Sequence, residues 1–242
     1  MNTWKTIWNK KKEDISALEI LGLNDFEAFS VLKKMDGFDV GVENAEEYYK
    51  HFYDLFDRMF SNIKNIMADR EIKSVFEVGC GSGVNLYMFK KRLPDIRLGG
   101  IDYSESFVNF TKQINPGGEF CCDEAINISV LPKFDVVLSD SVFQYFESLE
   151  YAEAVLTNMI SKCDGVIYLG EIHDKERKVE LLDYRRKTIE DYDEKYKYLS
   201  KLFIDKKQIK AIADRNGKKV IFENCYSKEY LNSKFIYNCY IY

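Results

Sequence analysis

The sequence predicts an α/β protein with a mostly parallel, seven-stranded sheet, helices on both of its faces and an antiparallel C-terminal strand. Three observations lead to this fold class. Apolar runs alternate with helical segments from about residue 73 onward, a turn with three glycines joins the first run to the next helix, and two β-rich runs end the chain. Such alternation places parallel strands in one sheet and their connecting helices on its faces.

The individual elements follow from periodicity and from turn residues. Apolar residues recur at three- and four-residue steps between about 44 and 68, which predicts a helix before the first strand. The strands are expected at about 73–78, 97–101, 119–122, 134–138, 165–170, 220–222 and 235–242. The later helices are expected at about 83–92, 104–114, 149–161 and 205–215.

Two segments lie outside this alternation. Residues 1–42 are expected to form an N-terminal lid or cap segment, and residues 43–242 the ligand-binding domain. The densely charged stretch at about 175–200 also carries four tyrosines and is long for a connection in this fold. Long insertions in compact domains are often lids or binding loops, so we expect a substrate lid there.

The first strand runs into a glycine-rich turn, since residues 77–83 read EVGCGSG. Glycine lets the backbone approach a ligand closely, and the helix N-terminus behind the turn offers free N–H groups and a positive dipole end. The carboxylate of Glu77 suits a ligand that also carries positive charge. This combination points to S-adenosylmethionine, whose amino-acid part is zwitterionic and whose sulfonium is cationic.

The stretch resembles the first motif of class I S-adenosylmethionine-dependent methyltransferases, E/D-x-G-x-G-x-G. Residues 99–104, 121–125 and 134–142 are similar to the second, third and fourth motifs of that family, in the same order. The resemblance covers roughly a hundred residues. It implies a Rossmann-like class I methyltransferase fold with S-adenosyl-L-methionine as cofactor and S-adenosyl-L-homocysteine as product.

The resemblance also implies specific cofactor contacts. Asp102, at the end of the second strand, would accept hydrogen bonds from two ribose hydroxyls, because a carboxylate offers two acceptor oxygens. Asp123 would accept a hydrogen bond from the adenine amino group. The expected cofactor-binding residues are Tyr49, Glu77, Gly79, Cys80, Gly81, Gly83, Asp102, Tyr103, Ser104, Asp123, Glu124, Ala125 and Ser139.

The catalytic candidates follow the fourth and fifth strands, at the edge where ligands bind in open α/β sheets. His173 is the best candidate for a general base, because its ordinary pKa lies near neutrality. Asp140 is the second catalytic candidate, and it could equally cap the next helix. Gln144, Tyr145 and Glu171 are expected to contact the substrate. No metal is expected, since Mg²⁺ usually needs a firmer oxygen cage.

Composition narrows the function classes. The formal net charge of −5 argues against general nucleic-acid binding, which needs a basic surface. No run of 18 apolar residues predicts a membrane span, and the first residues lack the apolar core of a signal peptide. A cytoplasmic location and reduced cysteines are therefore expected.

The sequence thus predicts a methyltransferase that modifies an oxygen of a small-molecule or glycan-precursor acceptor, of sugar-nucleotide-like type. Residues 4–10 and 139–146 are similar to small methyltransferases of bacterial capsule and surface-polysaccharide loci, which implies a role in capsule biosynthesis. A small-molecule N-methyltransferase, a non-catalytic cofactor-binding regulator and a homodimer stay open. A dinucleotide oxidoreductase is disfavoured, because Val84 stands where its third glycine belongs.

Overall fold

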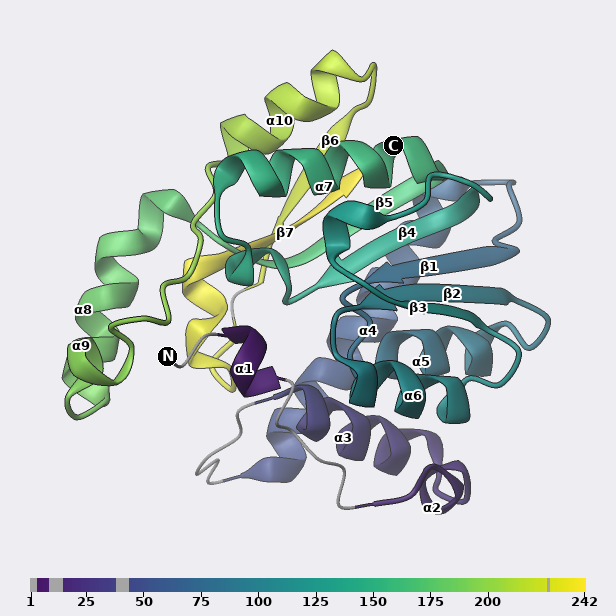
Figure 1. The fold of residues 1–242 in the computed structure, drawn as a ribbon, viewed down its shortest axis with the longest axis horizontal. Coiled ribbons are helices and arrows are strands. Elements are labelled where there is room, and N and C mark those ends of the chain that lie inside the picture. The colour runs from purple at the N-terminus through teal and green to yellow at the C-terminus, as the bar shows by residue number, and fades with distance from the viewer. Residues whose placement is uncertain (1–3, 9–14, 38–43, 226) are drawn as a thin grey trace.

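The computed structural model describes residues 4–8, 15–37, 44–225 and 227–242. Its centre is one seven-stranded sheet with the order β3-β2-β1-β4-β5-β7-β6 and helices on both faces (Figure 1). β7 runs antiparallel to both β5 and β6, and the other neighbouring strands are parallel. The fold class predicted from the sequence is confirmed.

The strands lie close to their expected positions. They are β1 Ser74–Val78, β2 Arg97–Asp102, β3 Glu119–Cys122, β4 Phe134–Asp140, β5 Cys163–His173, β6 Val220–Asn224 and β7 Ile236–Ile241. β5 extends three residues beyond the range expected from its apolar run, because Ile172 and His173 still pair with β7. Antiparallel pairing therefore carries this strand past the edge of its parallel neighbour.

The helices cover the sheet and extend from it. They are α1 Trp4–Trp8, α2 Ala17–Leu21, α3 Asp25–Asp36, α4 Ala45–Met67, α5 Val84–Arg92, α6 Glu105–Ile114, α7 Leu149–Lys162, α8 Lys178–Thr188, α9 Tyr192–Lys195 and α10 Lys206–Arg215. Short 3₁₀ turns are η1 Ala125–Asn127, η2 Phe143–Tyr145, η3 Lys175–Arg177 and η4 Leu231–Phe235. None of the described helices has both the length and the apolarity needed to cross a bilayer.

The N-terminal segment adds three helices that periodicity did not predict. Capping boxes start α2 and α3, because Ser16 pairs with Glu19 and Asn24 pairs with Glu27 through side-chain and backbone hydrogen bonds. α3 then packs against α4 and α5. Of the expected cap segment at 1–42, residues 1–3, 9–14 and 38–42 lie outside the described residues, as does residue 43.

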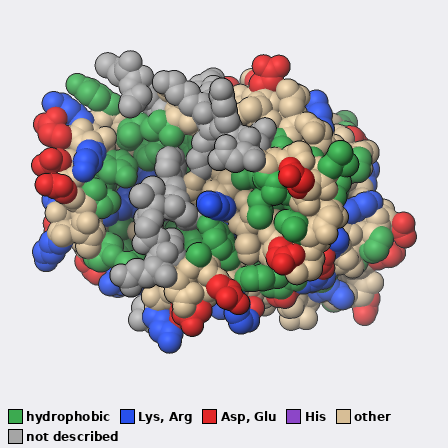
Figure 2. All heavy atoms as spheres, turned by 90° about the horizontal axis from the view of Figure 1, so that it is seen from below, with side chains coloured by type: hydrophobic (Ala, Val, Ile, Leu, Met, Phe, Trp, Pro, Cys, Tyr) green, Lys and Arg blue, Asp and Glu red, His purple; other side chains and the backbone are tan. Residues whose placement is uncertain are grey.

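The expected insertion at about 175–200 contains η3, α8 and α9. Leu181 on α8 is fully buried and packs with Phe203 and Phe235. In Figure 2, the end of the molecule that α8 and α9 form carries acidic and basic side chains on its outer edge, with hydrophobic side chains behind them. The insertion is therefore docked on the domain through Leu181 and Arg185, the two buried residues of α8.

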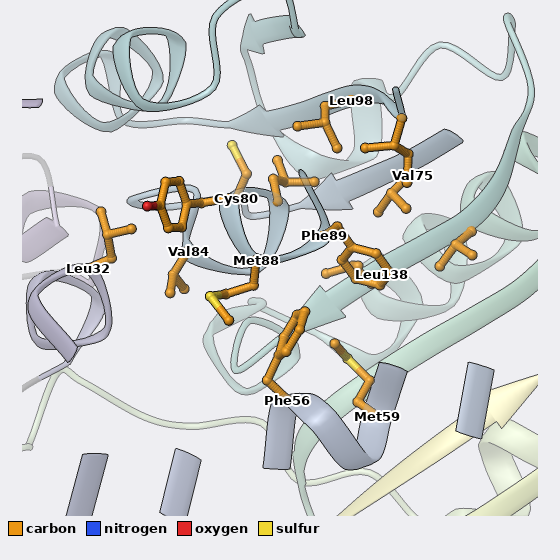
Figure 3. Packing of buried hydrophobic residues seen from close by; sticks show 14 of the residues in the cluster. Leu32, Phe56, Met59, Val75, Cys80, Val84, Met88, Phe89, Leu98 and Leu138 are labelled. Carbon is orange, nitrogen blue, oxygen red and sulfur yellow. The ribbon is translucent and has the colours of Figure 1, made fainter. Parts of the chain in front are cut away.

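Two apolar cores lie on the two faces of the sheet, and successive strand residues point alternately into one core and the other. Val136 and Leu138 of β4 point into the core shared with α3, α4 and α5, which Figure 3 shows from close by. Val137 points into the opposite core, shared with α7 and α10. This alternation fixes which residues at the strand ends face which layer.

Candidate active site

The turn between β1 and α5 depends on glycine. Gly79, Gly81 and Gly83 have φ values of 72°, 47° and 79°, a region that other residues adopt only at a cost. A Cβ on Gly79 would lie 2.4 Å from Cγ2 of Val142, so a side chain has no room there. The glycines therefore leave the backbone accessible between the carboxyl end of β1 and the N-terminus of α5.

Asp102, at the end of β2, fixes one side of this turn. Its Oδ2 accepts a hydrogen bond from the Gly81 N–H at 3.0 Å, and its Oδ1 accepts one from the Ser104 N–H at 2.9 Å. Burial raises the pKa of Asp102, and the two N–H donors partly offset this effect. Each oxygen keeps a further lone pair, so the carboxylate can still accept from a ligand diol.

Asp36, the last residue of α3, fixes the other side of the turn. Its carboxylate accepts hydrogen bonds from the backbone N–H and the hydroxyl of Ser82, both at 2.7 Å. Ser82 is fully buried just before α5. Asp36 thus holds, from another helix, the residue that precedes the N-cap of α5. No sequence pattern links the two residues, which are 46 positions apart.

Glu77 is a buried carboxyl group with one oxygen left over. Its Oε1 accepts a hydrogen bond from Asn85 Nδ2 at 2.7 Å, whereas Oε2 has no partner among the described residues. Burial raises the pKa of Glu77 well above its ordinary value. An orphaned buried oxygen beside a glycine cradle fits a ligand that brings a hydrogen-bond donor, such as the ammonium group of an amino acid.

The other residues that the sequence predicts to bind the cofactor differ in burial and in their hydrogen bonds. Ser139 is fully buried and donates its hydroxyl to the Val78 carbonyl at 3.0 Å, so its side chain ties β4 to β1. Asp123 accepts from the Glu124 N–H and from Asn127 Nδ2. The remaining predicted positions, whose roles stay predictions, are Tyr49 and Cys80, both buried, Ser104, fully buried, and Tyr103, Glu124 and Ala125, half-buried.

A cavity of about 440 Å³, counted with its opening to solvent, lies at the carboxyl ends of β4 and β5. Three charged side chains line it: Lys33 from α3, Asp140 from β4 and Glu171 from β5. Nζ of Lys33 lies 3.3 Å from Oδ2 of Asp140, and the Tyr230 hydroxyl donates to Glu171 Oε2 at 3.3 Å. The walls are mainly aromatic and aliphatic, so the cavity is an apolar pocket with a few convergent polar groups.

The backbone at this edge is strained at two neighbouring positions. Ser141 and Glu171, which follow β4 and interrupt β5, have φ values of 59° and 55°. Regular alternation would place Glu171 on the same face as Leu169, but an irregularity between Leu169 and Ile172 turns it toward the cavity instead. Strain of this kind persists where the surrounding structure imposes it, and it concentrates at functional sites.

The charges in the cavity perturb one another. Burial raises the pKa of Glu171, and the nearby Lys33 ammonium opposes that shift. Burial by itself would lower the pKa of Lys33, but Asp140, Glu171 and Asp36 together raise it. Lys33 therefore stays protonated, and Glu171 is a carboxyl group with more than ordinary proton affinity.

His173 does not line this cavity, and its predicted role as general base stays a prediction. It is 4% exposed, and its ring lies 5.1 Å from that of Phe203, under the segment that follows the insertion. Burial and then the charges of Lys201 and Arg185 lower its pKa well below the ordinary value. His173 is therefore neutral in the absence of an added anion.

The two residues expected to contact substrate after β4 lie beside the cavity rather than in its wall. Gln144 is buried and donates from Nε2 to the carbonyl and the hydroxyl of Ser141, both at 2.9 Å. Tyr145 packs under α1, with its ring centroid 4.9 Å from that of Trp4 and 5.7 Å from that of Trp8. Sequence reasoning missed Lys33, which reaches the cavity from a helix that it did not predict.

The strand order, the glycine turn after β1 and the carboxylate at the end of β2 define the class I methyltransferase fold. Residues 76–164 match the family described as a methyltransferase domain. The chain thus has the class I methyltransferase fold. Its glycine turn, Asp102 and the unpartnered Glu77 oxygen fit S-adenosylmethionine.

Particular relatives extend this result. The chain is 28% identical over 123 residues to a malonyl-[acyl-carrier protein] O-methyltransferase of Acetivibrio thermocellus, which is 48% of this chain and 43% of that protein. The chain thus spans less than half the length of this curated relative.

Two solved structures share the fold. One is magnesium protoporphyrin IX methyltransferase from Synechocystis PCC 6803 with bound S-adenosylhomocysteine, with a TM-score of 0.61, 16% identity, and coverage of 98% of this chain and 97% of that one. The other is an amino pentose methyltransferase from Micromonospora echinaspora, with a TM-score of 0.60, 10% identity, and coverage of 85% and 99%. At these identities the likeness establishes the fold.

Removing the Asp102 carboxylate should weaken cofactor binding. Asp102→Ala would leave the ribose hydroxyls and the Gly81 N–H without their acceptor, which costs roughly 1–3 kcal/mol, or about tenfold or more in affinity. Calorimetry with S-adenosylhomocysteine measures this effect. Asp95→Ala, an exposed carboxylate before the opposite end of β2, is the control. Equal affinity of Asp102→Ala and the wild type would remove Asp102 from the cofactor site.

Removing the Asp36 carboxylate should destabilise the protein and loosen the turn. Asp36→Ala leaves two donors of the fully buried Ser82 unsatisfied, so we expect a loss of roughly 1–3 kcal/mol in the free energy of unfolding. Asp36→Asn, which keeps one acceptor oxygen, should lose less. Denaturant unfolding measures both, with the exposed Lys34→Ala on the same helix as control. A stability of Asp36→Ala equal to that of Lys34→Ala would contradict the clamp.

Proposed function

We propose that this chain is an enzyme that transfers the methyl group of S-adenosylmethionine to an oxygen of a small-molecule acceptor. The observation that carries the proposal is the cavity at the ends of β4 and β5, which Asp140 and Glu171 line together with Asn85, the second residue of the helix that follows the glycine turn. The O-methyltransferase name of the curated relative supports oxygen over nitrogen.

The residues of this chain would orient the acceptor, exclude water from it and accept its proton. Bound S-adenosylmethionine would supply an activated methyl group, whose bond to sulfur breaks, with the electron pair left on sulfur, as the bond to the acceptor oxygen forms. The aromatic walls of the cavity exclude water from the acceptor, and Lys33 holds Asp140 in a fixed orientation. Glu171 is the group we assign to accept the proton of an acceptor hydroxyl, because it lines the cavity and burial raises its pKa.

A sugar-type acceptor is the second candidate. The solved neighbour from Micromonospora echinaspora is an amino pentose methyltransferase with a similar fold, and the acidic pair in this cavity also suits an amino or hydroxyl group of a sugar. The capsule-polysaccharide role predicted from two short segments finds no counterpart among these relatives and stays a prediction. Measuring S-adenosylhomocysteine formation with malonyl thioesters, amino sugars and nucleotide sugars separates the candidates, and no turnover with any acceptor class would favour the non-catalytic regulator.

Glu171→Gln should lower kcat by about 10²–10⁴-fold with little change in cofactor affinity, since the amide cannot take a proton. In the wild type, kcat should rise with pH through the pKa of Glu171, which burial places above the ordinary 4.5, because the ionised carboxylate is the active form. The exposed Glu176→Gln is the matched control. Near-normal turnover of Glu171→Gln, with a large loss in His173→Asn, would return the role of base to His173.

The insertion remains our proposal for a substrate lid. α8 and α9 flank the carboxyl edge of the sheet and are anchored by few buried side chains, among them Leu181. Hydrogen exchange of residues 178–199 should be fast in the free protein and should slow when S-adenosylhomocysteine and an acceptor are both bound. Full protection without any ligand would instead indicate a static structural element.

A further inference from the structure

A second polar group lies beside the cavity, and nothing in the proposed mechanism uses it. It consists of Arg185 on α8, Lys201 in the segment after α9, and His173 at the end of β5. Phe203, two residues after Lys201, brings them together, because its ring lies 5.1 Å from that of His173 and packs with Leu181, one helical turn before Arg185. In agreement with this, Lys201 and Arg185 both lower the pKa of His173, and Arg185 lowers that of Lys201. Three basic groups therefore face one another at the base of the insertion.

Arg185 is buried without an anionic partner. The residue is 9% exposed, yet its guanidinium makes no hydrogen bond or ion pair with any of the described residues. It lies one helical turn after the fully buried Leu181, so it belongs to the docked face of α8 rather than to its solvated face. An arginine carries five N–H donors and stays charged, so a guanidinium on the docked face of a helix without a counter-ion can take an anionic ligand.

Lys201 is held in place beside it by neighbours that do not neutralise it. Its Nζ lies 5.3 Å from the ring centroid of Trp4 and 4.8 Å from that of Tyr145. The backbone on both sides is fixed, because the Ser200 carbonyl accepts from Trp4 Nε1 at 2.9 Å and the Leu202 N–H donates to Gln144 at 2.8 Å. No carboxylate of the described residues lies within ion-pair distance of this ammonium.

His173 supplies an independent sign of a missing partner. Its Nδ1 is buried and has no hydrogen-bond partner among the described residues. Burial, followed by Arg185, lowers the pKa of Lys201 to about 7, and only Glu171 opposes this shift. Arg185 and Lys201 thus lack an anionic partner, and Nδ1 of His173 lacks a hydrogen-bond partner. An anion bound among the three residues would supply a partner to each.

We propose that Arg185, Lys201 and His173 form a binding site for an anionic group of the acceptor, a carboxylate or a phosphate. The site rests on the proposed function only in its assumption that the anion belongs to the methyl acceptor. Glu171 connects the two places, since it acts electrostatically on Lys201 and also lines the cavity with Asp140. An acceptor anchored by its anion at Arg185 would thus extend toward Glu171. The planar guanidinium fork suits carboxylate and phosphate oxygens in a bidentate arrangement.

The first test measures anion binding to the full chain without any methyl transfer. Calorimetry with malonate, inorganic phosphate and the uncharged malonamide is carried out with and without S-adenosylhomocysteine. We expect at least one anion to bind with a Kd on the order of 1 mM or tighter, and malonamide not to bind. Whether malonate or phosphate binds more tightly identifies the anion. Absence of binding by both anions would overturn the proposal.

Matched variants locate the site. Arg185→Gln should weaken anion binding by about tenfold or more, as should Lys201→Gln, because each removes a charged donor. Lys187→Gln, an exposed lysine on the same helix without an ion pair to the described residues, should bind as the wild type does. Circular dichroism checks folding, and Arg185→Lys, which keeps the charge, should retain part of the affinity. Wild-type affinity in Arg185→Gln and Lys201→Gln would place the anion elsewhere.

Nuclear magnetic resonance adds a readout that a structural role would not move. The chain has two histidines, so His51→Gln assigns the two imidazole signals. The added anion should raise the pKa of His173 and leave that of His51 unchanged, and an unmoved His173 would contradict the site. Anion binding without methyl transfer to any acceptor would remove the proposed function and keep this site. Normal methyl transfer to an anionic acceptor by Arg185→Gln would keep the proposed function and remove this anion site.

Discussion

The glycine turn after β1 is held by two carboxylates from opposite directions, and the rest of the site depends on this clamp. Asp102 binds the N–H of Gly81 from β2, and Asp36 binds Ser82 from α3. The first contact belongs to the sheet, whereas the second ties the N-terminal segment to it. Because Lys33 precedes Asp36 by three residues, one helical turn, the same docking brings the Lys33 ammonium to Asp140. One contact thus shapes both the cofactor loop and the acceptor cavity.

The fold was largely predictable, because it depends on local patterns. Each strand of the parallel part is a short apolar run, and the glycine turn marks where the first of them ends. α2 and α3 were missed although a signal exists: the pairs Ser16 with Glu19 and Asn24 with Glu27 are capping boxes in the sequence. α2, with five residues, shows too few periodic positions for a pattern of apolar residues to identify it.

The chemistry of the site was less predictable, for geometric reasons. The sequence indicated that Asp140 and Glu171 lie near the carboxyl ends of adjacent strands, and they do, but the side-chain direction at the end of β5 depends on a single backbone irregularity. The positive φ of Glu171 turns this side chain into the cavity. His173 is only two residues away and lies under Phe203 instead. The contact of Lys33 with Asp140 joins positions 107 residues apart, which no local pattern reveals.

The charges that surround the acceptor come from outside the part of the chain that matches the methyltransferase family. That match ends at residue 164 and begins at residue 76, whereas Lys33 precedes it and Glu171, Arg185 and Lys201 follow it. Within the match lie the glycine turn and Asp102, which we assign to the cofactor, and Asp140, which pairs with Lys33. The separation between cofactor residues inside the match and acceptor residues outside it has a physical basis. The cofactor is the same throughout the class, so the same loop can bind it, whereas each acceptor requires its own arrangement of charge. In this protein that arrangement is an acidic pair balanced by Lys33 on one side of Glu171 and an unbalanced basic group on the other, which together favour an acceptor with its own negative charge.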